Sequence, residues 1–238
     1  MAAGLSVQFL RPLDYPWFAI LGAVTVPAAA LLMAHRRVRL DDLAEKMLPT
    51  ALLILAVVFA ALLAEGQILR IVLVAVGTIG SFLSLELLFL YTFMPSRYPV
   101  NGLSRVNIAY VPLTVFFATA TSVGLMTFLH SSSLLHIVGM VFLGLALFRT
   151  TGHPDATREQ NNRWMLVGGI TGLHLGLLGT VLPISMNAQG AIAMLVFCGI
   201  LRTRRYLYQP YPGKFQTWTE LALGTFLLVS ITVTARWL

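Results

Sequence analysis

The sequence predicts an all-α integral membrane protein: a polytopic helical bundle of about eight transmembrane helices, with the N-terminus and the C-terminus both outside. Three observations lead to this fold class. The chain is strongly apolar, its apolar residues fall into eight stretches, and its basic residues alternate between connections. Of its 238 residues, 58% are hydrophobic and only 11% are charged. Because a soluble domain has roughly a quarter of its residues charged, most of this surface must face lipid.

The apolar stretches set the expected transmembrane helices of one domain, residues 1–238. They lie near 16–34, 47–64, 68–94, 107–129, 134–148, 163–184, 188–201 and 218–236. Most are long enough, because about 20 residues cross the hydrocarbon core. Stretches 134–148 and 188–201 are short. Either flanking polar residues complete them or one is re-entrant, which lowers the count to six or seven.

The basic residues set the orientation. Alternate connections hold 13 of the 16 lysines and arginines: Arg36, Arg37, Arg39, Lys46, Arg97, Arg105, Arg149, Arg158, Arg163, Arg202, Arg204, Arg205 and Lys214. Wrongly placed helices would scramble this alternation, so it supports the helix count as well. By the positive-inside rule these connections face the cytoplasm, which places both termini outside.

The N-terminal region and the connections indicate the compartment. The first fifteen residues lack a basic region followed by an apolar run, so we expect the first apolar stretch to remain in the membrane. The connections are short, and the chain contains no Asn-x-Ser/Thr sequon. We therefore expect a multi-pass protein of a prokaryotic cell (plasma) membrane.

Several function classes lack support in the sequence. The net charge of +7 is explained by orientation, so we expect no nucleic-acid partner. Motifs of metalloproteases, serine hydrolases and nucleotide-binding loops do not occur. His130 and His136 flank the outer turn 131–133 and make a poor metal site, because no carboxylate accompanies them. We expect no metal and no cofactor.

Glu86 is a carboxylate inside the apolar stretch 68–94. Helical periodicity places the small or polar residues of this stretch on one face: Gly77, Gly80, Ser81, Ser84, Tyr91 and Thr92. Glu86 points away from that face, among Phe82, Leu83, Phe89 and Leu90. We expect another helix or a cavity on that side, because lipid would leave the carboxyl unsatisfied.

His174 is a second ionisable residue inside an apolar stretch. Counted from the nearest cytoplasmic arginine, Glu86 and His174 lie at a similar depth. If they meet, they could relay a proton or couple proton movement to a solute. Otherwise Glu86 is a neutral structural carboxyl, and His174 bonds a neighbouring carbonyl or hydroxyl.

Gly168, Gly172 and Gly176 are spaced four residues apart around His174. With Gly77, Gly80 and Ser84 of the stretch 68–94, they are the expected helix-packing residues. Small residues in register let two helix backbones approach closely in lipid. A static helix contact is the simpler interpretation, and a sliding interface in a transporter is the alternative.

The segment 202–214 interleaves Arg202, Arg204, Arg205 and Lys214 with three tyrosines. These cations are expected either to bind anionic lipid or a partner on the cytoplasmic side, or to anchor the topology. Thr217 and Glu220 have the spacing of a capping box that opens the last helix.

Three functional hypotheses follow. The first is a non-enzymatic subunit or scaffold of a membrane complex, associated with other membrane subunits or with itself. The second is a small proton-coupled transporter or permease that uses Glu86 and His174. An intramembrane lipid-processing enzyme comes third, because the sequence offers no catalytic constellation.

Overall fold

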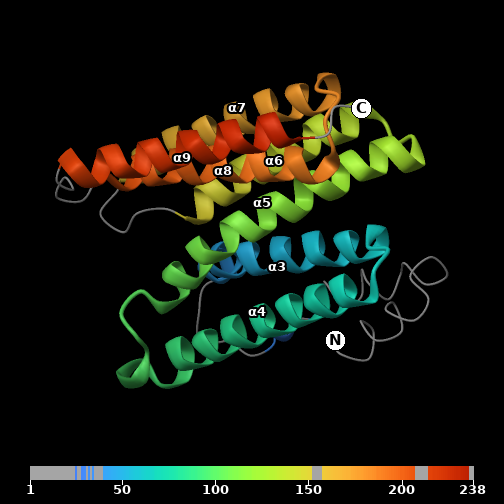
Figure 1. The fold of residues 1–238 in the computed structure, drawn as a ribbon. Helices are drawn as coiled ribbons and strands as arrows, with labels where there is room; N and C mark the ends of the chain where they lie inside the picture. Colours follow the sequence, from blue (N-terminus) through green and yellow to red (C-terminus); the bar gives the residue numbers. More distant parts are fainter. Residues whose placement is uncertain are drawn as a thin grey trace. The chain divides into compact units, whose positions relative to one another are not determined.

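The computed structural model describes residues 40–151, 157–206 and 214–235, with a few residues between 25 and 34. In these ranges the helices are α3 (Leu40–Leu63), α4 (Gln67–Phe93), the 3-10 turn η1 (Pro95–Arg97), α5 (Gly102–Leu129), α6 (Ser133–Thr150), α7 (Arg158–Val181), α8 (Met186–Tyr206) and α9 (Lys214–Thr234) (Figure 1). Each of the seven α-helices is long and apolar enough to cross a membrane. The all-α class and the multi-pass membrane character are therefore confirmed.

Seven of the eight expected stretches coincide with these helices, while most of the expected stretch 16–34 lies outside the described residues. The two short stretches become complete helices: α6 has 18 residues and α8 has 21. Helix α8 extends through Arg202 and Arg204 because helical geometry satisfies the backbone of polar residues as well as apolar ones. The eight-span count and the location of the termini stay predictions.

Helices α3, α5, α7 and α9 start four to seven residues before the expected stretches. Helix α7 begins five residues early, because Thr157 and Gln160 form a reciprocal capping box there. The capping box expected at Thr217 and Glu220 is wrong, because both residues lie inside α9, which already includes Lys214. Glu220 instead pairs with Arg202.

The chain divides into two compact units, Met1–Ala118 and Thr119–Leu238, and α5 contributes its first part to one and its last part to the other. In the first unit α3, α4 and the start of α5 enclose an apolar core that includes Leu53, Val57 and Leu73. Pro49 interrupts the backbone hydrogen bonding of α3, and Asn107 of α5 donates its side-chain amide to the Lys46 carbonyl one turn earlier, at 3.0 Å. The carbonyl that loses its helical donor to Pro49 is that of Glu45, so the Asn107 bond holds the neighbouring position of the same turn.

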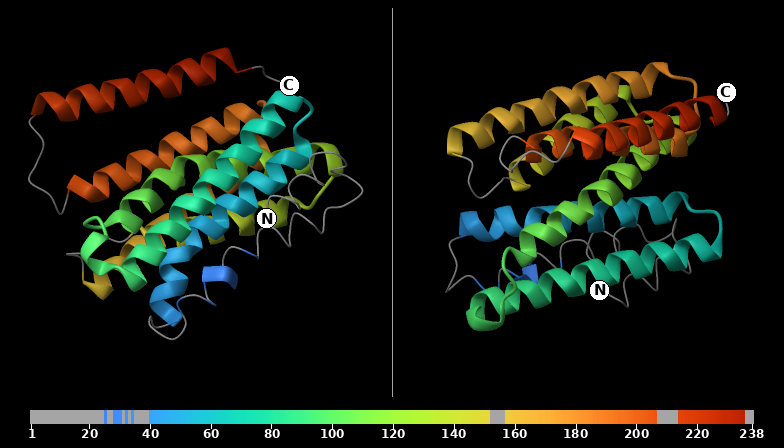
Figure 2. Two further views of the ribbon diagram at one scale, coloured as in Figure 1. Left: turned by 90° about the horizontal axis from the view of Figure 1, so that it is seen from below. Right: turned by 60° about the vertical axis from the view of Figure 1, so that its left-hand side comes forward.

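In the second unit α6 and α7 run side by side (Figure 2), and glycines lie at their contact. Phe148 of α6 and Phe197 of α8 are fully buried and stack edge to face, with ring centroids 5.9 Å apart. Helix α9 lies at the edge of this unit, beside α8, and no residue of its apolar segment is buried. The core of the second unit is therefore built from α5 to α8.

Candidate functional site

Glu86 lies on the outer side of α4. The buried residues of this helix are Leu73, Gly77, Gly80, Ser81, Ser84 and Leu88. Glu86 is exposed, and so are its neighbours Phe82 and Phe89, at 64% and 36%. Among the described residues the carboxyl has no hydrogen-bond or ion-pair partner, and the further helix expected to cover it is not found. The carboxyl therefore lies in an exposed apolar surface.

The opposite face of α4 carries a hydrogen-bond network that joins three helices. Thr50 of α3 donates to Ser84 at 2.8 Å, and Ser84 donates to Tyr110 of α5 at 3.2 Å. The Tyr110 hydroxyl in turn donates to the Gly80 carbonyl at 2.6 Å. Each of these three hydroxyl groups donates its hydrogen, and all three side chains are buried. Such a network fixes the relative position of the helices, since each buried hydroxyl needs its partner.

Gly80 makes room for this network. A side chain there would meet Leu53 at 3.0 Å and the Tyr110 ring at 3.6 Å. The sequence indicated Gly80 and Ser84 as packing residues but did not indicate Thr50 or Tyr110. Their signal is weak, because a single Thr or Tyr in an apolar stretch is common at membrane depth.

His174 of α7 is also exposed. Its Nδ1 donates to the carbonyl of Ile170, one turn earlier on the same helix, at 2.8 Å. Because a carbonyl can only accept, Nδ1 carries the hydrogen, and Nε2 has no partner among the described residues. Glu86 and His174 belong to different units, so their contact stays a prediction.

The glycines of α7 lie where this helix meets α6. A Cβ on Gly168 would collide with the carbonyl of Gly144, and one on Gly172 with the carbonyl of Met140. Gly176 faces the backbone of Ile137, 3.0 Å from where its Cβ would be. The two backbones are in direct contact, which only glycine permits. Gly144, the partner on α6, was missed because it is a single glycine without a repeated spacing.

Arg202 bridges α8 to α9. Its guanidinium donates two hydrogen bonds to the Glu220 carboxylate, at 2.9 and 2.5 Å, and Tyr206 also donates to this carboxylate. This fork-to-carboxylate geometry is the strong form of an ion pair. It joins α9 to the rest of the unit at one end.

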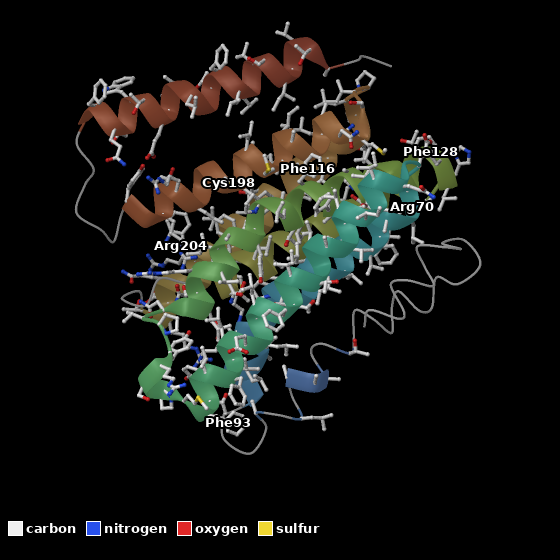
Figure 3. The ribbon with its side chains drawn as sticks, turned by 60° about the horizontal axis from the view of Figure 1, so that its bottom comes forward. Arg70, Phe93, Phe116, Phe128, Cys198 and Arg204 are labelled. Carbon is white, nitrogen blue, oxygen red and sulfur yellow. The ribbon has the colours of Figure 1, made fainter. Side chains whose placement is uncertain are left out.

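Arg204, labelled in Figure 3, belongs to α8. Its exposed fraction is only 3%. It donates to the carbonyl of Phe148 at 2.9 Å and to the Asn161 side chain of α7 at 2.5 Å, and it lies over the Trp164 ring. Phe148 is in the last turn of α6, where carbonyls lack helical partners and the helix dipole is negative. Arg204 therefore caps α6 from a neighbouring helix. The side chains of Arg205 and Lys214 lie outside the described residues, so lipid binding by this segment stays a prediction.

A second polar cluster, not indicated by the sequence, lies between α5, α6, α7 and α8. His136 is 3% exposed and contacts Ser122 of α5 through Nδ1 at 2.8 Å. Gln189 of α8 is 7% exposed, and both residues approach Gly179 of α7. Both residues fall within the expected stretches 134–148 and 188–201, and both lie inside helices, His136 in α6 and Gln189 in α8. The sequence did not indicate that they come together.

The comparisons with other proteins add no function. No protein-family model, no curated protein and no solved structure matches this chain.

Proposed function

We propose that this multi-pass membrane protein is a non-enzymatic subunit or scaffold of a membrane complex, and that a partner helix covers the Glu86 side of α4. The observation that carries this proposal is the position of Glu86. An exposed apolar surface at membrane depth normally faces lipid, yet this one contains a carboxyl without a partner in the described chain. An acidic residue at the centre of a membrane helix costs about 2.5–3.5 kcal/mol on insertion scales.

Charge complementarity indicates the chemistry of the partner. A transmembrane helix with a basic or hydrogen-bond-donating side chain at the depth of Glu86 would satisfy the carboxyl. Phe82 and Phe89, one turn to each side, supply apolar contact area around the polar pair. The interface would then have a polar centre with an aromatic surround, which suits specific recognition in lipid.

Purification from native membranes in a mild detergent tests this proposal. We expect the wild type to bring a second membrane protein in fixed stoichiometry, and Glu86→Leu to release it. Because Glu86 is exposed and has no hydrogen-bond or ion-pair partner among the described residues, the variant should remain folded. Glu65→Leu is the matched control, since Glu65 is exposed in the connection between α3 and α4. A wild type that purifies alone, or a Glu86→Leu variant that keeps its partner, contradicts the proposal.

The alternative is a small proton-coupled transporter that uses Glu86 and His174. It is supported by the two ionisable groups themselves, each of which keeps a polar atom without a partner among the described residues. In proteoliposomes containing a pH-sensitive dye, this function requires a proton flux that Glu86→Gln and His174→Gln both abolish. A partner-bound protein without proton flux would exclude the transporter and leave the scaffold.

A further inference from the structure

The cluster around Gly179 contains two buried atoms that can only accept hydrogen bonds. The hydroxyl of Ser122 donates to the Thr119 carbonyl at 3.0 Å, so its oxygen is left to accept. The Nδ1 of His136, 2.8 Å from that oxygen, must then carry the hydrogen. In this tautomer the other ring nitrogen, Nε2, has a lone pair, and it has no hydrogen-bond partner among the described residues.

Hydrogen bonds also fix the orientation of the Gln189 side-chain amide. Its side-chain nitrogen donates to the carbonyls of Leu182 and Ile184, at 3.0 and 3.3 Å, in the connection between α7 and α8. Two carbonyl partners fix the amide so that the NH₂ group faces them. The amide oxygen, Oε1, therefore points the other way, and it also lacks a partner in the described part of the chain.

Gly179 brings these two acceptors to one place. The position that a Gly179 Cβ would take is 2.5 Å from His136 Nε2 and 3.0 Å from Gln189 Oε1. A single small group can therefore lie within hydrogen-bond reach of both atoms. Two buried acceptors close to one point without a donor are unfavourable, because each has lost its hydrogen bonds to water.

We propose that His136 Nε2 and Gln189 Oε1 form a binding site for a small neutral molecule with two hydrogen-bond donors, the class to which water belongs. The donor class follows from the chemistry of the site, since both groups offer only lone pairs. A neutral ligand follows from its surroundings, because the groups that approach His136 from α5, α7 and α8 are Ser122, Gly179 and Gln189. None of these three groups is charged, so they would not compensate a cation.

Nitrogen NMR of the ¹⁵N-histidine-labelled protein in lipid nanodiscs tests the site with water as the probe. His136→Gln identifies the His136 signals by their loss. We expect a neutral ring with Nδ1 protonated and with Nε2 shifted as an acceptor of a hydrogen bond. An Nε2 chemical shift typical of a lone pair without a hydrogen bond would overturn the proposal. So would a protonated Nε2, whether the ring is neutral or charged. This measurement needs no variant that alters the site.

Two variants locate the donor. Gly179→Ala places a methyl group where the donor binds, and Gln189→Leu removes the second acceptor. In each folded variant the Nε2 signal should move toward that of a free acceptor. Gly199→Ala on α8, where a side chain meets nothing within 4 Å, should leave the signal unchanged. An unchanged Nε2 signal in folded Gly179→Ala would show that its donor lies elsewhere and would contradict the proposed position.

Discussion

At the scale of single residues, the described helices are held by polar side chains that end on backbone carbonyls. Tyr110 donates to Gly80, Asn107 donates to Lys46, and Arg204 donates to Phe148. Each donor comes from a different helix than its acceptor. In a bilayer no water is available to replace such a bond, so each one selects a particular helix arrangement.

Tyr110→Phe tests how much one of these hydrogen bonds between helices contributes to stability, because it removes a single oxygen atom. The ring remains, but the Gly80 carbonyl and the Ser84 hydroxyl each lose a partner. We expect a loss of about 1 kcal/mol in the free energy of unfolding, measured by detergent denaturation. Tyr98→Phe makes the same chemical change outside this network. It is an imperfect control, because it also removes a hydrogen bond, the one that Tyr98 accepts from the Leu103 amide. No loss in Tyr110→Phe would show that the three-hydroxyl network contributes little to stability.

At the scale of elements, the pair α6–α7 is the most closely packed among the described helices. Glycines from both helices meet, and Gly144 faces Gly168 backbone to backbone. Such a contact gains dispersion energy along the whole length of the pair, which is the main source of helix association in lipid. It also leaves no clearance for a larger side chain on either helix. This geometry agrees with the static helix contact that the glycine spacing indicated, and the sliding alternative needs evidence of a second arrangement.

Gly144→Ala should separate α6 from α7. Because its methyl group would collide with the Gly168 carbonyl, we expect a loss of about 1–3 kcal/mol, seen as a lower thermal midpoint in detergent. Gly139→Ala on the same helix is the matched control. A side chain there meets nothing within 4 Å, so this change should be neutral or stabilising by up to about 1 kcal/mol. Equal effects of the two variants would contradict the close backbone contact.

At the scale of the whole molecule, the two units carry different kinds of polar group. In the first unit the hydroxyl network is satisfied, and Glu86 faces outward on α4. The second unit has a bonded Arg204 at one end of α6 and two unsatisfied acceptors near the other end. Both units have helices long enough to cross a membrane, and the orientation expected from the basic residues stays a prediction for both.

Cysteine labelling tests that orientation. In a Cys198→Ala background, Ser133→Cys should react with a membrane-impermeant maleimide in intact cells, because it lies at an expected outer connection. Ser96→Cys, in the turn between α4 and α5, should react only after permeabilisation. Both serines are exposed, so access to the reagent is matched. The reverse pattern would invert the topology, and an N-terminal tag accessible from outside would support the first expected span.

The sequence by itself determined the membrane class, seven of the helices and the face of α4, opposite its small residues, on which Glu86 lies. These depend on apolar content and on the periodicity of one helix, which are local properties. Only the tertiary structure decided which side chains meet. Tyr110 reaches Gly80 from 30 residues away, Arg204 reaches Phe148 from 56, and His136 meets Gln189 across Gly179. Such contacts depend on which helices are neighbours and on how each helix is rotated about its axis. An apolar sequence pattern does not determine either, because any apolar face can be in contact with lipid.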